Sequence, residues 1–209
     1  MSNRVTRRAI AEDPGPGLTR VQLVKWGAAA GGAMAAGGLL AGGLPMPAIS
    51  QPSPAQDRQV LEWLVQVQHL EAGFYTEAER RGALRGELRE LSQLVGEQDR
   101  AHVAALERAV GGAGSNRPKF DFGDATSDPQ RFLAAALEIE ELALAAVNGQ
   151  VPNLTKRRIV TVMGIASVEA RHVGWVRDLA GRNPAPRPAD VPATQDKTRA
   201  AIEATGFTT

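Results

Sequence analysis

Two short patterns in the sequence place an imidazole three residues after a carboxylate. They are Glu169-x-x-His172 and Asp99-x-x-His102. Residues three apart share one face of a helix, so each pair can direct two ligand groups at one point. Carboxylate oxygens and imidazole nitrogens suit iron or manganese, and zinc less well because the chain has no thiolate. The two patterns therefore indicate a metal site, provided that both pairs face inward.

The Glu169/His172 pair falls on an apolar helical stripe, where polar groups are costly. The stripe recurs at helical spacing through Ile159, Val162, Met163, Ala166, Val173 and Val176. A carboxylate buried on such a face needs a charge or hydrogen bonds to compensate it. A bound cation would meet that need. The alternative is a buried polar cluster that Arg100, Arg171 or its own members satisfy.

Four long helices are expected to position these side chains, because apolar residues recur at helical spacing between segments rich in glycine and proline. In the first, Gln68 and Glu71 interrupt the apolar face, and in the third Glu140 does so. Glu138 and Glu141 fall off that face and are expected to be solvated. The helices are predicted at about residues 56–81, 87–110, 129–148 and 154–180.

The polar positions are spaced alike in the two halves of the chain. Gln68 precedes His102 by 34 residues, and Glu140 precedes His172 by 32. This spacing predicts two similar hairpins whose polar patches meet at one level. The long irregular segment 111–128 lets the chain cross the bundle between the second and third helices. The pattern is that of an all-α four-helix bundle with a di-metal carboxylate site.

Composition narrows the function further. The chain has 209 residues, no cysteine and a formal net charge of +1. Disulfides and cysteine nucleophiles are therefore excluded. The part after residue 50 shows no basic patch, so nucleic acid is not expected as a partner.

Residues 1–50 look separate from the fold, because arginines and a lysine precede a Gly/Ala-rich apolar run at 26–44. The segment 19–25 resembles a twin-arginine export signal in which Val21 replaces the second arginine. We expect export to the periplasm or cell envelope. An uncleaved membrane anchor and a disordered arm are the alternatives. After a linker at 51–55 and the bundle at 56–181, a Pro-rich tail at 182–209 is expected to hold one short helix near 194–204.

The helical motifs resemble the ferritin-like superfamily, and most closely bacterial exported ferritin-like domain proteins, some of which are described as desiccation-related. The resemblance covers about residues 56–181. It implies one or two iron or manganese ions. The motifs that carry it are Leu70-Glu71-Ala72-Gly73-Phe74-Tyr75, Asp99-Arg100-Ala101-His102, Leu137-Glu138-Ile139-Glu140-Glu141 and Glu169-Ala170-Arg171-His172.

The chain departs from the ferritin pattern on one side of the bundle. Counting seven residues back from Tyr75, where ferritins carry a glutamate ligand, leads to Gln68, and Asp99 replaces a longer glutamate. Either Gln68 or Glu71 is then the variable ligand of the first helix. The expected set is Gln68, Glu71, Asp99, His102, Glu140, Glu169 and His172.

These departures predict unequal metal positions, with the Glu140/Glu169/His172 side binding better. Two function classes remain open. One is ferrous oxidation or peroxide handling at the metal site. The other is a metal-poor, non-enzymatic envelope protein that protects against stress through a partner surface. The sequence is compatible with a homo-oligomer but gives no indication of a ferritin cage.

Overall fold

The structure is a computed structural model that describes residues 51–112 and 117–209. These residues form helices, and within them the only β-structure is one isolated antiparallel bridge between Phe120 and Thr208. No helix within the described ranges is long and apolar enough to cross a membrane. The helices are α2 (Pro54–Arg81), α3 (Gly86–Val110), η1 (Gly123–Thr126), α4 (Pro129–Gln150), η2 (Val151–Asn153), α5 (Lys156–Leu179) and α6 (Gln195–Ala204).

The helix ends have local causes in the sequence. The Ser53 side chain accepts a hydrogen bond from the Gln56 backbone N–H at 3.2 Å and thereby caps α2. Asp128 caps α4 in the same way, and Pro129 occupies the first turn. Gly82 stops α2 in the left-handed conformation, at a φ of 59°. The four predicted long helices are confirmed to within a few residues at each end.

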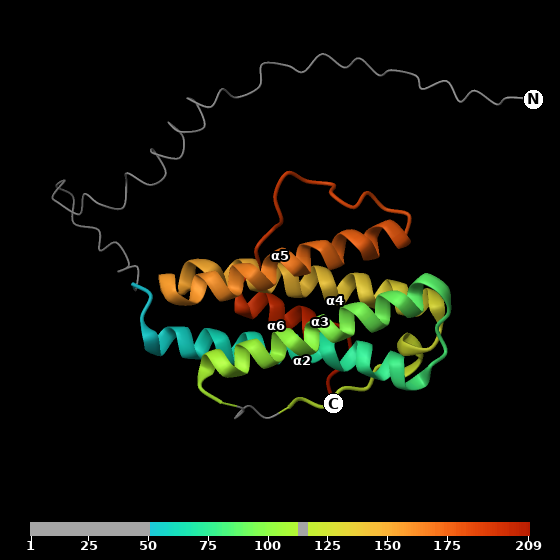
Figure 1. The fold of residues 1–209 in the computed structure, drawn as a ribbon, viewed down its shortest axis with the longest axis horizontal. Coiled ribbons are helices and arrows are strands. Elements are labelled where there is room, and N and C mark those ends of the chain that lie inside the picture. Colours follow the sequence, from blue (N-terminus) through green and yellow to red (C-terminus); the bar gives the residue numbers. More distant parts are fainter. Residues whose placement is uncertain (1–50, 113–116) are drawn as a thin grey trace, which may run out of the picture. The chain divides into compact units, whose positions relative to one another are not determined.

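The four long helices form two hairpins that pack together as a bundle (Figure 1). α2 packs along α3 and α4 packs along α5, while α2 also contacts α4 and α3 contacts α5. The two inter-hairpin contacts hold the hairpins together. Gly96 lets α3 approach α2 closely, because a Cβ at this position would lie 2.8 Å from the Cβ of Tyr75.

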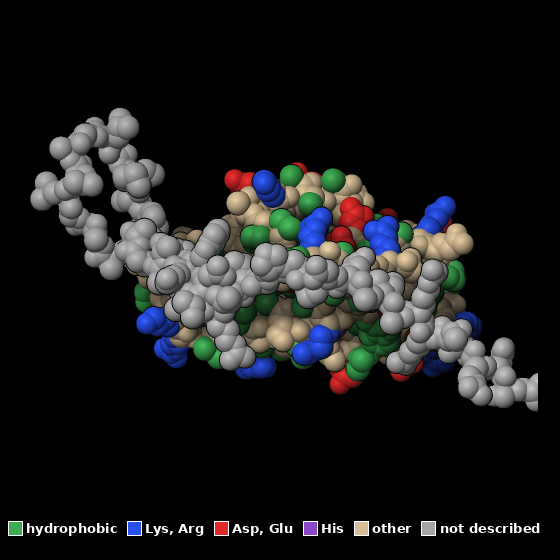
Figure 2. Space-filling model, turned by 90° about the horizontal axis from the view of Figure 1, so that it is seen from above, with side chains coloured by type: hydrophobic (Ala, Val, Ile, Leu, Met, Phe, Trp, Pro, Cys, Tyr) green, Lys and Arg blue, Asp and Glu red, His purple; other side chains and the backbone are tan. Residues whose placement is uncertain are grey.

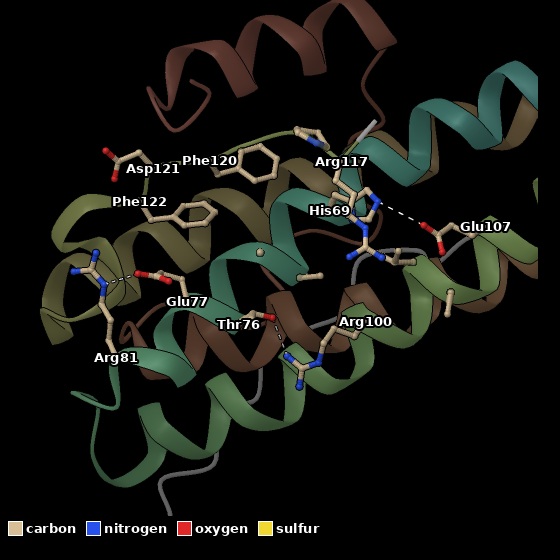
Figure 3. Close-up of a pocket in the computed structure, with 15 residues that line it drawn as sticks. His69, Thr76, Glu77, Arg81, Arg100, Glu107, Arg117, Phe120, Asp121 and Phe122 are labelled. Carbon is tan, nitrogen blue, oxygen red and sulfur yellow. Dashed lines mark hydrogen bonds and ion pairs between the residues drawn. The ribbon is translucent and has the colours of Figure 1, made fainter. Parts of the chain in front are cut away.

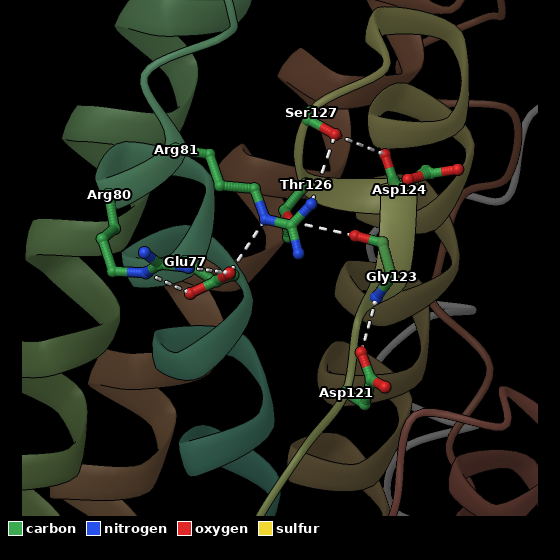
Figure 4. Close-up of polar contacts among 8 residues, drawn as sticks. All are labelled: Glu77, Arg80, Arg81, Asp121, Gly123, Asp124, Thr126 and Ser127. Carbon is green, nitrogen blue, oxygen red and sulfur yellow. Dashed lines mark hydrogen bonds and ion pairs between the residues drawn. The ribbon is translucent and has the colours of Figure 1, made fainter.

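Residues 117–128, the described part of the connection between α3 and α4, return along the bundle, as the long irregular segment predicts (Figure 1). The η1 end of this connection is tied to the end of α2 (Figure 4). The Arg81 guanidinium donates to Glu77 at 2.8 Å and to the Ser127 hydroxyl at 3.5 Å. The Asp121 side chain accepts from the Gly123 backbone N–H at 3.0 Å. The Arg81 contacts thus join the end of α2 to the residues just before α4.

The C-terminal residues pair with the same connection. The backbone N–H of Asp121 donates to the carbonyl of Phe207 at 2.9 Å, and the rings of Phe122 and Phe207 lie 5.3 Å apart. The predicted short terminal helix is present as α6, which packs against α4. The Pro-rich stretch before α6 forms no helix.

The core consists of two apolar clusters with a polar layer between them. The first cluster contains Phe74, Leu91, Phe132 and Val176, and the second contains Leu61, Leu106, Val147 and Val162. On each long helix, the predicted ligand positions lie in sequence between residues of the two clusters. Apolar packing therefore seals the polar layer on both sides along the bundle axis.

One residue of the predicted α5 stripe does not face the core. Met163 is 46% exposed, whereas Val162 is completely buried. A helix turns about 100° per residue, so Met163 lies at the edge of the stripe that Val162 and Ala166 define. The prediction extended the buried face too far. Glu138 is exposed as predicted, and the partly exposed Glu141 pairs with Arg177 at 2.9 Å.

The expected export signal at residues 1–50 lies outside the described residues. On the face of the domain seen in Figure 2, basic and acidic side chains are interspersed with apolar ones.

Candidate metal centre

All seven side chains that the sequence singles out meet inside the bundle. α2 supplies Gln68 and Glu71, α3 supplies Asp99 and His102, α4 supplies Glu140, and α5 supplies Glu169 and His172. The five members other than the histidines are completely buried, and the two histidines are 9% and 4% exposed. Each helix thus brings at least one polar group to the layer between the apolar clusters.

Glu169 links the two halves of this cluster. Its Oε1 atom lies 3.0 Å from Nδ1 of His102, and its Oε2 atom lies 3.5 Å from Nδ1 of His172. The rings of the two histidines are 6.1 Å apart. Each oxygen of one carboxylate therefore faces a different imidazole.

Two groups of three ligand atoms fit a metal ion by distance, and both include Glu169. The first is Asp99, His102 and Glu169, and the second is Glu140, Glu169 and His172. Within each group the atoms lie within 4.8 Å of one another. Glu169 is thus the one residue that the two groups share.

The hydrogen-bonding capacity of the cluster is far from satisfied. Buried polar atoms in proteins almost always have partners. Here neither carboxylate oxygen of Asp99 has a hydrogen-bond partner, although the side chain is completely buried. Among the described residues, the cluster atoms without a hydrogen-bond partner are Gln68 Oε1, Glu71 Oε1, Asp99 Oδ1 and Oδ2, His102 Nδ1, Glu140 Oε2, Glu169 Oε2 and His172 Nδ1. Donor atoms of this chemistry, converging without partners, fit one or two divalent cations.

Burial shifts the pKa values of the carboxyl groups in the cluster. Burial, followed by repulsion from neighbouring carboxylates, raises the pKa of Glu71 and of Asp99 well above the ordinary range. Burial also raises the pKa of Glu140, although His172 and Tyr75 oppose the shift. Burial thus favours the protonated forms of these three carboxyl groups.

Glu169 and His172 behave in the opposite sense, because they contact each other. Burial alone would raise the pKa of Glu169, but its contacts with His102 and His172 outweigh burial and lower the pKa to about 2. Burial alone would lower the pKa of His172, but the contacts with Glu140 and Glu169 raise the pKa to about 10. The two side chains form an ion pair at 3.5 Å.

The α2 positions differ from each other in role. The Gln68 amide donates to Glu169 at 3.0 Å and also contacts Glu71. Gln68 therefore orients two carboxylates while its own carbonyl oxygen remains unpaired. Glu71 brings a fourth carboxylate to the cluster one helical turn from Gln68. Neither side chain belongs to the two groups that fit a metal by distance.

Two contacts to the cluster were not predicted from the sequence. Tyr75, noted only as a motif residue, donates its hydroxyl proton to Glu140 at 2.7 Å. Gln98 was not singled out at all, and its Oε1 atom lies 2.7 Å from Nε2 of His172. In the sequence, only its position four residues before His102 on α3 could have indicated that Gln98 lies near the cluster.

The match to a family model agrees with this geometry. Residues 56–182 match the model described as the ferritin-like domain. The chain belongs to this family. A comparison with curated proteins finds no match. The chain is thus a ferritin-like helical bundle whose buried carboxylates and histidines could hold metal.

The ferritin-like domain also has a surface pocket of about 690 Å³ between α2, α3 and the segment after residue 117 (Figure 3). His69 faces this pocket rather than the buried cluster, and its Nε2 atom lies 3.7 Å from Glu107. Burial, together with the nearby Arg117, lowers the pKa of His69. His69 is therefore separate from the seven side chains of the buried cluster.

Proposed function

We propose that this ferritin-like domain binds a pair of divalent cations, iron or manganese, in the polar layer of the bundle. The observation that supports this most strongly is Glu169, whose two oxygens face two different histidines inside a buried cluster of unpaired donor atoms. Asp99, His102 and Glu169 would hold one ion, and Glu140, Glu169 and His172 the other.

The charges of the cluster support a pair of ions. The carboxylates of Glu71, Asp99, Glu140 and Glu169 supply about four negative charges once they are deprotonated. Two divalent cations would neutralise them. Without cations, several like charges would face one another in a dry core, which is costly. In this charge balance, Glu71 supplies the negative charge that the neutral Gln68 lacks.

The two ion positions should differ in strength. On the α4/α5 side, Glu140 and His172 are completely or almost completely buried and each has an outer hydrogen bond, from Tyr75 and to Gln98 respectively. On the α2/α3 side, Asp99 has a shorter arm and His102 is the most exposed member of the cluster. We expect the Glu140/Glu169/His172 position to bind its ion more tightly.

A pair of iron or manganese ions would supply electron transfer to oxygen or peroxide. The protein's part is to hold the ions close together and to keep bulk water away. The two apolar clusters on either side of the polar layer keep bulk water away. We propose ferrous oxidation or peroxide handling as the reaction class, and oxygen consumption on addition of Fe(II) to the purified protein tests it.

Metal analysis of the purified protein is the direct test of binding. Anaerobic titration with Fe(II) or Mn(II), followed by mass-spectrometric metal analysis, should give up to two ions per chain with unequal affinities. The proposal fails if the protein retains no ion after removal of the free metal.

A metal-poor structural role is the alternative, and the Glu169–His172 ion pair favours it, because the pair partly compensates the cluster without metal. Melting curves discriminate between the two. A metal protein should lose stability when a chelator removes its ions. An unchanged melting temperature would favour the structural role.

We further propose that residues 1–50 direct export to the periplasm or cell envelope. The basic residues before the Gly/Ala-rich run support this. N-terminal sequencing of the protein from the envelope and cytosolic fractions tests it. A start at Ser2 in the cytosolic fraction would contradict export.

A further inference from the structure

We infer that Gln98 is a positioning residue of the metal centre, which holds the ring of His172 so that its Nδ1 atom faces the cations. This inference rests on the proposed function. It assigns a role to a side chain that lies outside the predicted ligand set and that α3, not α5, supplies.

The geometry of the His172 ring is the basis of the inference. Nε2 lies 2.7 Å from Oε1 of Gln98. On the other edge of the ring, Nδ1 lies 3.7 Å from Asp99 and 3.5 Å from both Glu140 and Glu169. The two nitrogens thus face different surroundings: one faces a single amide oxygen, and the other faces three carboxylates.

An amide oxygen can only accept, so Nε2 of His172 must carry the proton that it donates to Gln98. In the neutral ring that binds a metal, the lone pair then lies on Nδ1. A hydrogen bond of this kind fixes the orientation of a ligand imidazole and makes it more basic. Gln98 therefore selects both the direction of the ring and the nitrogen that meets the ion.

His102 provides the internal comparison. Its Nδ1 atom also faces the cluster, 3.0 Å from Glu169. Within the described residues, no hydrogen bond to its other ring nitrogen is present. Its side chain is 11% exposed, against 4% for His172. The hydrogen bond to Gln98 thus distinguishes the two histidines, and its effect should be confined to the ion that His172 holds.

Three variants of the full chain test this role. Gln98→Leu keeps much of the side-chain volume but removes the acceptor. Gln98→Glu keeps an acceptor and should rescue binding. Gln93→Leu makes the same change at an exposed glutamine of the same helix and serves as the matched control. Each is titrated anaerobically with Mn(II), and melting curves confirm that each variant is folded.

Gln98→Leu should weaken the tighter of the two ions by about 10–100-fold, the usual effect of losing such a hydrogen bond, and leave the other ion unchanged. Gln98→Glu and Gln93→Leu should bind like the unmodified chain. If Gln98→Leu binds both ions normally, the inference is wrong. It is also wrong if all three variants lose metal equally.

A second measurement separates this inference from the proposed function. The chain has three histidines, so ¹⁵N-histidine NMR of the metal-free protein can follow each ring. The Nε2–H proton of His172 should be protected from exchange in the unmodified chain and lose that protection in Gln98→Leu. Equal exchange in both would contradict the hydrogen bond. If the unmodified chain instead binds no metal, the proposed function fails, and the positioning role fails with it even where the proton is protected.

Discussion

In the α4/α5 half of the cluster, Glu140 accepts a hydrogen bond from Tyr75 and His172 donates one to Gln98. In the α2/α3 half, neither oxygen of Asp99 has a hydrogen-bond partner, and the His102 side chain is 11% exposed. The residue types of the two halves are nearly the same. They differ in whether neighbouring side chains hold the ligands in place.

This comparison suggests that ligand identity alone does not set the strength of each position. Outer hydrogen bonds reduce the freedom that a ligand side chain loses when it binds an ion, and so they favour the half that has them. We expect the neutral Gln68 to weaken further the half that already lacks such support.

Removal of the Glu169 carboxylate should have the largest effect on metal binding, because both halves of the cluster use it. Glu169→Gln takes one ligand from each half at once. We expect both ions to be lost, with affinities reduced by more than the ~10–100-fold that an outer hydrogen bond contributes. Mass-spectrometric metal analysis measures this, and Glu138→Gln on the exposed face of α4 is the control. Retention of both ions in Glu169→Gln would show that the halves are not bridged.

Removal of the histidines one at a time should reveal the asymmetry directly. His172→Gln should lower the overall affinity for metal about tenfold more than His102→Gln does. A factor of about ten is the lower end of the range for losing an outer hydrogen bond. Calorimetric titration with Mn(II) measures both. Equal losses would mean that the hydrogen bond from His172 to Gln98 has no bearing on affinity.

Restoration of the missing charge should make the halves more alike. Gln68→Glu adds a negative charge next to Glu169, so the weaker ion should bind several-fold more tightly. A tenfold gain in affinity would correspond to about 1.4 kcal/mol. The metal-free variant should also be less stable, because another like charge enters the core. Calorimetric titration with Mn(II) tests the expected gain in affinity. A decrease in affinity would mean that Glu71 already supplies all the charge that the site accepts.

The metal-free protein should become less stable as the pH rises from 5 to 8. The pKa values of Glu71, Asp99 and Glu140 are raised by burial, and that of His172 is raised to about 10. The folded chain therefore holds more protons than the unfolded chain in this range. Unfolding then releases protons, which a higher pH favours, so the stability falls as the pH rises.

Bound cations should remove this dependence, because they replace the protons. The melting temperature of the metal-free protein should therefore be several degrees lower at pH 8 than at pH 5, whereas that of the metal-bound protein should not change. A change of ~1 kcal/mol shifts the melting temperature of a domain of this size by about 2–4 °C. Melting curves with chelator and with Mn(II), at both pH values, measure it. A metal-free protein that is more stable at pH 8 would contradict the assignment of raised pKa values to the cluster.

Much of the fold and of the cluster was predictable from the sequence. The caps at Ser53 and Asp128 and the periodic apolar faces determine the helices locally. The cluster followed because carboxylates and histidines interrupt those faces at matching positions. The spacing could not show that one oxygen of Glu169 faces each histidine, because that depends on the approach of α3 to α5.

What the sequence did not show depends on tertiary packing. Gln98 lies at the edge of the α3 face, and only the position of the other hairpin brings it to His172. Met163 was placed in the core because periodicity defines the centre of a buried face better than its edge. The nature of residues 1–50 remains a sequence-based prediction.

Anomalous diffraction from crystals grown with Mn(II), and separately with Fe(II), tests the central claim most directly. The account predicts a pair of peaks between the four helices, on either side of the Glu169 carboxylate, with the peak beside Glu140 and His172 the stronger. A bundle with no anomalous peak at this level, in which Glu169 remains paired with His102 and His172, would contradict it.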